Sequence, residues 1–127
     1  MNSPLTDLSA LEILRVFPDG VLIVAAPGNI VWVNRRAEEI FGYAASELAG
    51  QMIEMLLPVD LVRVNEQHRA LYTAKPTTRA MGTGIRLVGR RKNGALFRVE
   101  VSLSPVTAAA GLQIICTVRD LSEYLRV

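Results

Sequence analysis

The N-terminal part of the chain passes from helical spacing to two short apolar runs. Leucines recur at every third position after a Ser3-Pro4 start signal, which predicts a short amphipathic helix within residues 1–17. Apolar residues then fill positions 21–25 and 30–33 on either side of Pro27-Gly28-Asn29, which predicts two strands joined by a tight turn. The leucines of the predicted helix are Leu5, Leu8, Leu11 and Leu14.

Helical spacing returns in the middle of the chain. Asn34 stands where a helix N-cap is expected, ahead of residues 35–41, whose apolar members share one face. Short helical turns are expected after Ser46, which can cap the first of them, and over residues 53–57. Residues 59–74 predict one longer helix, because apolar side chains recur along one side of it.

After residue 76 the apolar period changes from about 3.6 residues to about 2. Apolar and polar residues alternate over 85–87 and 97–104, on either side of Asn93-Gly94, which is a strong hairpin signal. A further apolar run at 112–118, after a loop of small residues at 107–111, predicts the last strand. The order predicts an α+β domain with a five-stranded antiparallel sheet, helices packed on one face and an N-terminal amphipathic helix.

The composition fits one domain in a reducing compartment. Of the 127 residues 50% are hydrophobic and 20% are charged, so part of the apolar surface is expected to face a ligand or a partner. No run approaches the ~20 apolar residues of a membrane span, and residues 1–7 lack a secretory signal. Cys116, the only cysteine, cannot form an internal disulfide. These features predict a cytoplasmic segment without membrane contact.

The charged and nucleophilic residues predict neither an enzyme nor a nucleic-acid site. A formal net charge of +2 is small for a basic face, and the cationic run Arg90-Arg91-Lys92 has no interleaved aromatic residues to stack on bases. We interpret this run as a solvated turn. The single histidine and the single cysteine fall on different predicted elements, so that no metal site and no catalytic residues are expected.

A series of short motifs runs through the chain in a fixed order. They are Pro18-Asp19-Gly20-Val21, Val33-Asn34-Arg35-Arg36-Ala37, Ile40-Phe41-Gly42-Tyr43, Glu47-Leu48 with Gly50, Gly89-Arg90-Arg91-Lys92-Asn93-Gly94, Phe97-x-Val99-Glu100-Val101-Ser102-Leu103-Ser104 and Val118-Arg119-Asp120-Leu121-Ser122-Glu123. Each is weak alone, but in this order and spacing the chain resembles the PAS domain family from about residue 8 to residue 123.

The resemblance implies a curled sheet whose inner face and helices enclose a small-molecule pocket, coupled to a helix at a chain end. We therefore expect a sensory domain at residues 18–123 of a larger signalling protein, foremost a two-component sensor histidine kinase. Residues 124–127 would then begin the linker to an effector domain. Many family members dimerise through the N-terminal helix, so Leu5, Leu8, Leu11 and Leu14 are the expected contacts of a homodimer. The alternative is a domain that only dimerises and binds no ligand.

Cofactor-binding members of the family offer two comparisons. The histidine that ligates haem aligns with Asn65, and His68 lies about one helical turn later, which roughly preserves the helical face. Ile85 stands where haem-binding members often carry an arginine. Flavin photoreceptors carry their reactive cysteine on a helix, whereas Cys116 falls on the last predicted strand. Haem and flavin are therefore not expected, a haem sensor stays an alternative, and the cofactor is left open.

The side chains expected to line a cavity are nearly all apolar, which implies a largely apolar ligand with one polar anchor. The same side chains are equally suited to fill a core without any ligand, and both alternatives stay open. The lining candidates are Ile23, Val33, Ile40, Phe41, Leu56, Val64, Leu71, Ile85, Leu87, Val101, Ile114 and Cys116, and the anchor candidates are Asn65, His68 and Arg69.

The last motif contains the expected signal relay, Arg119, Asp120 and Ser122. In the family the acidic residue at this position ties the end of the sheet to the outgoing helix, and Asp120 or Ser122 can also cap that helix. A ligand-driven change in the sheet could then alter the helix or its pairing in a dimer. The alternative is a helix cap without a regulatory role.

Overall fold

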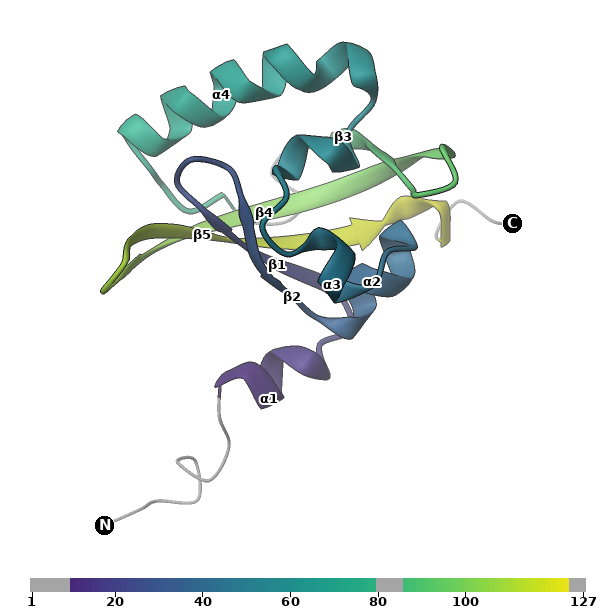
Figure 1. Cartoon of the computed structure of the whole chain (residues 1–127), viewed down its shortest axis with the longest axis horizontal. Helices are drawn as coiled ribbons and strands as arrows, with labels where there is room; N and C mark the ends of the chain where they lie inside the picture. Colours follow the sequence, from purple (N-terminus) through teal and green to yellow (C-terminus); the bar gives the residue numbers. More distant parts are fainter. Residues whose placement is uncertain (1–9, 80–85, 124–127) are drawn as a thin grey trace.

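A computed structural model of the chain describes residues 10–79 and 86–123, which form one antiparallel sheet and several short helices (Figure 1). In chain order the elements are α1 (Ala10–Arg15), β1 (Gly20–Ala25), β2 (Ile30–Val33), α2 (Arg35–Phe41), α3 (Ala45–Leu48), the 3₁₀ turns η2 (Ile53–Leu56) and η3 (Val59–Leu61), α4 (Val62–Ala74), β3 (Arg86–Arg90), β4 (Leu96–Ala108), β5 (Gly111–Asp120) and the 3₁₀ turn η4 (Leu121–Glu123).

The strand order is β2-β1-β5-β4-β3, and every neighbouring pair is antiparallel. The pair β1–β5 is the long-range contact, because it joins the first strand of the chain to the last, with Gly20 opposite Val118. The predicted α+β fold with a five-stranded antiparallel sheet is confirmed. The last hairpin is longer than predicted: the backbone pairing of β4 with β5 continues to Ala108 opposite Gly111, inside the segment expected to be a loop.

Helices α1 and α4 lie far from each other in the fold (Figure 1). Figure 1 shows α4 crossing above the sheet and α1 on the opposite side of the molecule, away from the other helices. No residue of α1 is buried. This helix lies within the predicted N-terminal helix, and residues 1–9 are outside the described part of the chain.

Two of the predicted helix starts differ from the structure. Ala44, and not Ser46, precedes α3, because Oε1 of Glu47 accepts a hydrogen bond from the backbone N–H of Ala44 at 2.9 Å and no hydroxyl is needed there. The segment predicted as one long helix starts with the 3₁₀ turn η3, and the α-helix follows from Val62.

Asn34 is the N-cap of α2, as predicted, and its buried side chain also holds the neighbouring strand. Oδ1 accepts hydrogen bonds from the backbone N–H groups of Ala37 and Val21, each at 2.9 Å. Nδ2 donates to the carbonyl oxygens of Leu14 and Asp19, at 2.9 and 3.1 Å. One amide therefore fixes the start of α2, the start of β1 and the chain that enters β1 from α1.

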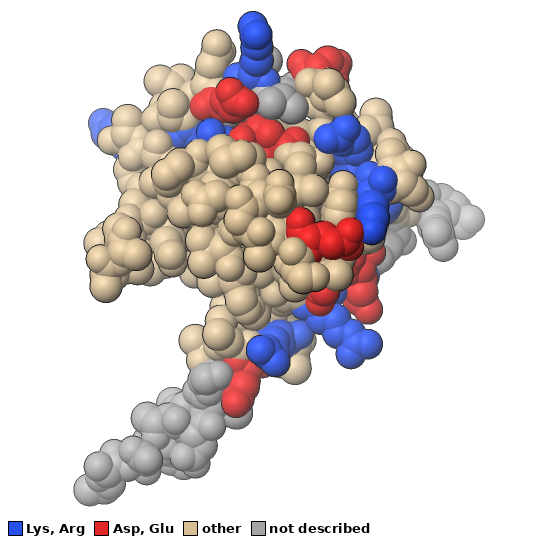
Figure 2. Space-filling view, in the orientation of Figure 1, with Lys and Arg blue, Asp and Glu red and all other residues tan. Residues whose placement is uncertain are grey.

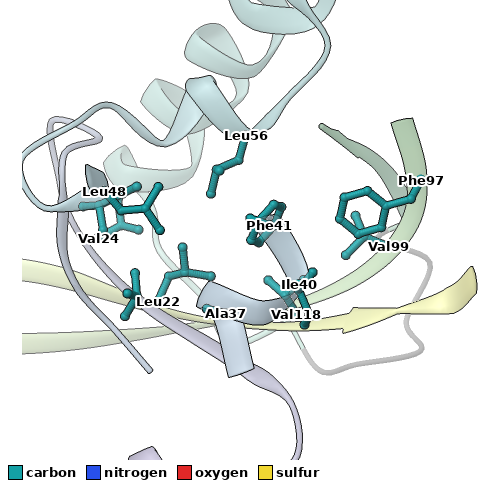
Figure 3. Packing of buried hydrophobic residues seen from close by; sticks show 12 residues of the cluster. Leu22, Val24, Ala37, Ile40, Phe41, Leu48, Leu56, Phe97, Val99 and Val118 are labelled. Atoms are coloured by element: carbon teal, nitrogen blue, oxygen red, sulfur yellow. The ribbon is translucent and has the colours of Figure 1, made fainter. Parts of the chain in front are cut away.

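The core lies between the inner face of the sheet and helices α2, α3 and η2 (Figure 3). Phe41 of α2 and Phe97 of β4 meet edge to face, with ring centroids 5.6 Å apart, a geometry that stabilises beyond the area buried. Figure 3 shows Phe41 between Leu56 of η2 and the strands below. The aromatic pair therefore fills the part of the sheet that α2 covers. The members of the buried cluster are Leu22, Val24, Ile30, Val33, Ala37, Ile40, Phe41, Leu48, Leu56, Phe97, Val99 and Val118.

We predict that Asn34→Ala lowers the free energy of unfolding by about 2–4 kcal/mol, since it removes the N-cap of α2 and leaves the N–H of Val21 buried without a partner. Urea unfolding followed by circular dichroism measures this loss. Asn93→Ala is the control, because Asn93 caps only an exposed turn through the N–H of Ala95. Equal losses in the two variants would contradict the role assigned to Asn34.

Candidate ligand pocket and C-terminal link

A cavity of about 220 Å³ lies between the inner face of the sheet and the segment formed by η2 and α4. Strands β1, β3, β4 and β5 supply its floor, while α4 and the segment after it supply the opposite side. The lining residues are Val24, Ala25, Ile53, Leu56, Leu57, His68, Arg69, Tyr72, Arg79, Leu87, Gly89, Val99, Val101, Leu103, Ile114 and Cys116.

The floor of the pocket is apolar because strands alternate their side chains between two faces and only one face is turned inward. The strand register places Leu87 opposite Val99 and Leu103 opposite Cys116, so these side chains adjoin one another on the same face. Burial raises the pKa of the Cys116 thiol to about 12, so this side chain is a neutral thiol at physiological pH and not a reactive thiolate.

The helix side of the pocket is polar. His68, Arg69 and Tyr72 reach it from α4. The guanidinium of Arg69 forms an ion pair with the buried carboxylate of Glu54 in η2. The same guanidinium lies against Gly28 in the β1–β2 turn, within 2.8 Å of the position that a Cβ atom would take there. Arg69 therefore ties α4 to η2 and to the sheet.

Tyr72 and Arg79 close one end of the pocket together. The hydroxyl of Tyr72 donates to the carbonyl oxygen of Thr77 at 2.6 Å, and the guanidinium of Arg79 lies 5.3 Å from the centre of the Tyr72 ring, a cation–π distance. The backbone of Arg79 exchanges two hydrogen bonds with Leu103 in β4, at 2.7 and 2.8 Å. The chain that follows α4 is thereby fixed against the sheet.

Five of the predicted lining residues line this pocket, Leu56, Leu87, Val101, Ile114 and Cys116, and so does the anchor candidate His68. Arg69, which the sequence suggested as an anchor, lines it too. Ile85 and the side chains of Val64 and Asn65 lie outside what the structure describes.

Five of the expected lining residues lie away from this pocket. Val33, Ile40 and Phe41 belong to the buried cluster below α2, and Val33 also borders a separate hollow beside β2 and α3. Ile23 pairs with Trp32 and Ile115 and points to the outer face, since its neighbours in β1 point inward. Leu71 is 73% exposed, because the inward face of α4 carries His68 and Tyr72, four residues apart, and Leu71 lies beside that face.

Sequence reasoning missed several lining residues, although two patterns point to some of them. Val99 and Leu103 flank the predicted Val101 at the strand period of two, and Tyr72 follows His68 at the helical spacing of four. The position of Arg79 has no such signal, because a single backbone bridge to Leu103 places it. The other residues missed are Val24, Ala25, Ile53, Leu57 and Gly89.

A second cluster links the end of β5 to the core. The guanidinium of Arg91 donates to Oδ2 of Asp120 at 2.9 Å and to the last turn of α2 at the carbonyl oxygen of Ile40. It also lies over the ring of Phe97, 3.8 Å from its centre. Oδ1 of Asp120 accepts hydrogen bonds from the backbone N–H and the hydroxyl of Ser122, at 2.9 and 2.6 Å, and so caps η4. Strand, helix α2 and outgoing turn therefore meet at one carboxylate.

The predicted relay residues are therefore placed together at the C-terminal end of the sheet. Asp120 and Ser122 contact each other directly, while Arg119 forms an ion pair with Asp19 at 3.2 Å, in the segment before β1. Burial opposes ionisation of Asp120, but the hydrogen bonds from Ser122 and Arg91 outweigh it and hold the pKa of Asp120 below its ordinary value.

The interpretation of Arg90-Arg91-Lys92 as a solvated turn is wrong for two of the three residues. Arg91 is largely buried in the cluster just described, and Arg90 donates to the carbonyl oxygen of Met55 at 3.0 Å. Lys92 is exposed but forms an ion pair with Glu47 at 2.6 Å. In the face that Figure 2 shows, cationic and anionic side chains are interspersed and form no area of one sign.

The residues predicted for a dimer are only partly described. Leu11 is exposed and Leu14 is half-buried, while Leu5 and Leu8 lie outside the described residues. The homodimer therefore stays a prediction. Within residues 10–79 and 86–123 no three acidic, histidine or cysteine side chains gather as a metal site would require, and no helix has the length and apolar character needed to cross a membrane.

The fold and the family agree. Residues 11–121 match the family model described as the PAS fold, so the chain belongs to the PAS fold family. A PAS domain from Colwellia psychrerythraea has a TM-score of 0.77 at 15% identity, covering 95% of this chain and 99% of that one. The PAS domain of a LuxR-family transcriptional regulator from Burkholderia thailandensis, in complex with ethanol, has a TM-score of 0.69 at 22% identity, covering 91% and 99%.

Curated relatives are signalling proteins. The chain is 25% identical over 113 residues to the sensor protein FixL of Bradyrhizobium diazoefficiens. The aligned segment covers 89% of this chain and 22% of FixL. It is 24% identical over 115 residues to the cell-division control histidine kinase PdhS of Brucella ovis, and this alignment covers 90% of this chain and 11% of PdhS. The chain thus spans 22% or less of these relatives. It is a PAS sensory domain, distantly related to the PAS modules of sensor histidine kinases.

We predict that Gly28→Ala destabilises the fold more than Gly111→Ala. Both glycines have a positive φ, 111° and 113°, so the backbone strain, about 1–3 kcal/mol, is shared. Only the new methyl at position 28 meets the guanidinium of Arg69, which must shift and so weakens its ion pair with Glu54, at a further cost of about 1 kcal/mol; at position 111 nothing lies within 4 Å. Urea unfolding compares the two, and equal losses would refute the role given to Arg69.

We predict that Asp120→Asn lowers the free energy of unfolding by about 1–3 kcal/mol at neutral pH, because the amide keeps the shape but loses the charge that Arg91 pairs with. Since the pKa of Asp120 is lowered in the fold, its contribution is complete above the ordinary value of 3.8 and is lost as the pH falls through the lowered value. Urea unfolding should therefore show the two proteins converging in acid. The exposed Glu39→Gln is the control and should change little at any pH. A pH-independent difference for Asp120→Asn would contradict the assignment.

Proposed function

We propose that this chain is the sensory module of a larger signalling protein, which binds a small, largely apolar molecule between α4 and the sheet. Binding is transmitted through the end of β5. The observation that carries the proposal is the strand register: Val99, which lines the pocket, stands directly opposite Asp120, where the chain leaves the sheet. One pair of residues thus joins the pocket to the cap of η4.

The volume supports a small ligand. A cavity of 220 Å³ equals the volume of roughly seven water molecules and lies below the ~300–1,000 Å³ of pockets for drug-sized ligands. A haem exceeds this space, and His68, the one histidine near it, is exposed, so the pocket does not fit a haem sensor. The ethanol complex of the related domain from Burkholderia thailandensis is an example of a ligand of suitable size in this fold. A cavity of this size also favours the ligand-binding alternative over a packed, ligand-free core.

The proposed transmission runs along strand β5, which contributes side chains to the pocket and ends at the C-terminal link. Ile114 and Cys116 line the pocket from β5, the strand that ends in Asp120. A ligand that displaces this strand would strain the bonds from Arg91 and Ser122 to Asp120, and these bonds hold η4. A ligand shifts such an equilibrium only by its difference in affinity between the two states, so the signal depends on how much β5 moves.

The wider role rests on the relatives. The histidine kinase PdhS and the sensor protein FixL contain a segment similar to this chain, so we place the module in a two-component sensor kinase or a related regulator. The module itself would not catalyse; an attached domain would provide the output. The unpaired thiol of Cys116 suits the reducing cytoplasm.

We predict that Val101→Phe weakens the binding of hexanol at least tenfold, because a larger side chain takes up space in the pocket. Titration followed by heteronuclear NMR measures the affinity. Val106→Phe is the control, since Val106 lies on the same strand but is 41% exposed outside the pocket. Weakening of the same size in both variants, or binding of hexanol by neither the parent nor the control, would reject this pocket as the binding site.

A further inference from the structure

The pocket has an uneven distribution of charge that its apolar floor does not require. Among the lining residues that the structure describes, His68, Arg69 and Arg79 can carry a positive charge, and none is a carboxylate. His68 and Arg69 lie on α4, opposite the apolar strands, and Arg79 lies beside β4 at the end of the pocket. A wholly apolar ligand would gain nothing from these groups, and their desolvation would oppose its binding.

Arg69 is not available to pair with a charged ligand. Its guanidinium is paired with Glu54 and packed on Gly28, so that its charge is balanced inside the fold. Arg79 differs. Within residues 10–79 and 86–123 its guanidinium has no carboxylate partner, and it rests on the ring of Tyr72 at the end of the pocket. The paired backbone hydrogen bonds to Leu103 hold it there without using its side-chain donors.

The neighbouring titratable groups do not oppose an anion. Burial raises the pKa of Tyr72, so its phenol stays neutral, and the Cys116 thiol, with a pKa of about 12, is neutral as well. The Tyr72 hydroxyl already donates to Thr77 and therefore positions the ring under Arg79 instead of binding a ligand. The planar guanidinium can donate two parallel hydrogen bonds to a carboxylate.

We propose that the pocket selects a small amphiphilic anion, a short-chain carboxylate whose carboxylate binds Arg79 and whose hydrocarbon tail lies on the apolar floor formed by Leu103, Cys116 and Val101. This inference rests on the proposed function of the same pocket and narrows it to one ligand class. The volume, equal to roughly seven water molecules, accommodates a tail of the size found in butyrate or hexanoate.

The test compares three probes with the same tail: hexanoate, hexanol and hexylamine, each titrated into the parent chain and followed by heteronuclear NMR. We expect hexanoate to bind at least about tenfold more tightly than hexanol, and hexylamine more weakly than either. In Arg79→Gln the affinity for hexanoate should fall to the affinity that the same variant has for hexanol, so that the preference for the carboxylate is lost. Arg98→Gln is the matched control, because Arg98 is an exposed arginine of β4 that does not line the pocket, and it should alter neither affinity.

The outcomes separate this inference from the function beneath it. Equal binding of hexanoate and hexanol, or an unchanged preference in Arg79→Gln, would overturn the anion selectivity while the apolar pocket stands. An equal loss of affinity for hexanoate in Arg98→Gln would also overturn the anion selectivity, since the preference for hexanoate would then reflect the net charge of the protein and not Arg79. No binding of any probe would reject the proposed function together with the inference.

Discussion

The four hydrogen bonds of Asn34 are the constraint on which the arrangement of this domain depends. A short strand must turn directly into a helix, and the helix must lie on the sheet that the strand has just left. The Asn34 amide satisfies the free N–H of the first turn of α2 and, at the same time, a backbone N–H of β1. The contact is close: a Cβ at Gly20 would lie 3.2 Å from the Cα of Ala37. Helix and strand can approach this closely because Gly20 has no side chain.

Fixing α2 in this way divides the inner face of the sheet into two parts. Below α2 the aromatic rings of Phe41 and Phe97 fill the space, and close packing of this kind leaves no room for a ligand. Below α4 the floor consists of aliphatic side chains and a thiol, while the helix presents polar groups such as His68 and Arg69. A helix that only completes a core ordinarily turns an apolar stripe inward. Among the α4 side chains that the structure describes, those that line the pocket are more polar than a packed core requires, which agrees better with a ligand site.

The sequence predicted the fold well because the period of its apolar residues is local information. The change from helical to strand spacing, the Asn93-Gly94 turn and the Asn34 cap all follow from near neighbours, and the five strands were found from them. The pocket depends on contacts distant in sequence. The face on which Ile23 lies cannot be read from the apolar run of β1, and only the pairing with β2 and β5 shows it. The helical spacing fits Leu71 and Tyr72 equally, and only the fold shows that Tyr72 lines the pocket while Leu71 is exposed. Arg79 and Arg91 could not be assigned, since their roles come from Tyr72, Leu103 and Asp120 across the fold.

Two ion pairs of an arginine with a buried carboxylate join neighbouring elements of the fold, one beside the pocket and one where the chain leaves the sheet. Arg69 and Glu54 hold α4 to η2, and Arg91 and Asp120 hold the β3–β4 hairpin to β5. Pairs of this kind add little net stability compared with apolar residues of the same volume, because both charges must lose their water. Their use here is geometric: each guanidinium also contacts a second element, Gly28 or the end of α2. A packed core has one arrangement, whereas an arginine with several partners can exchange one for another at modest cost. One such arginine lies at the pocket and one lies where the chain leaves the sheet, and the Val99–Asp120 pair connects β4 to β5 between them. These contacts form a physical route by which binding in the pocket could change the contacts of Asp120.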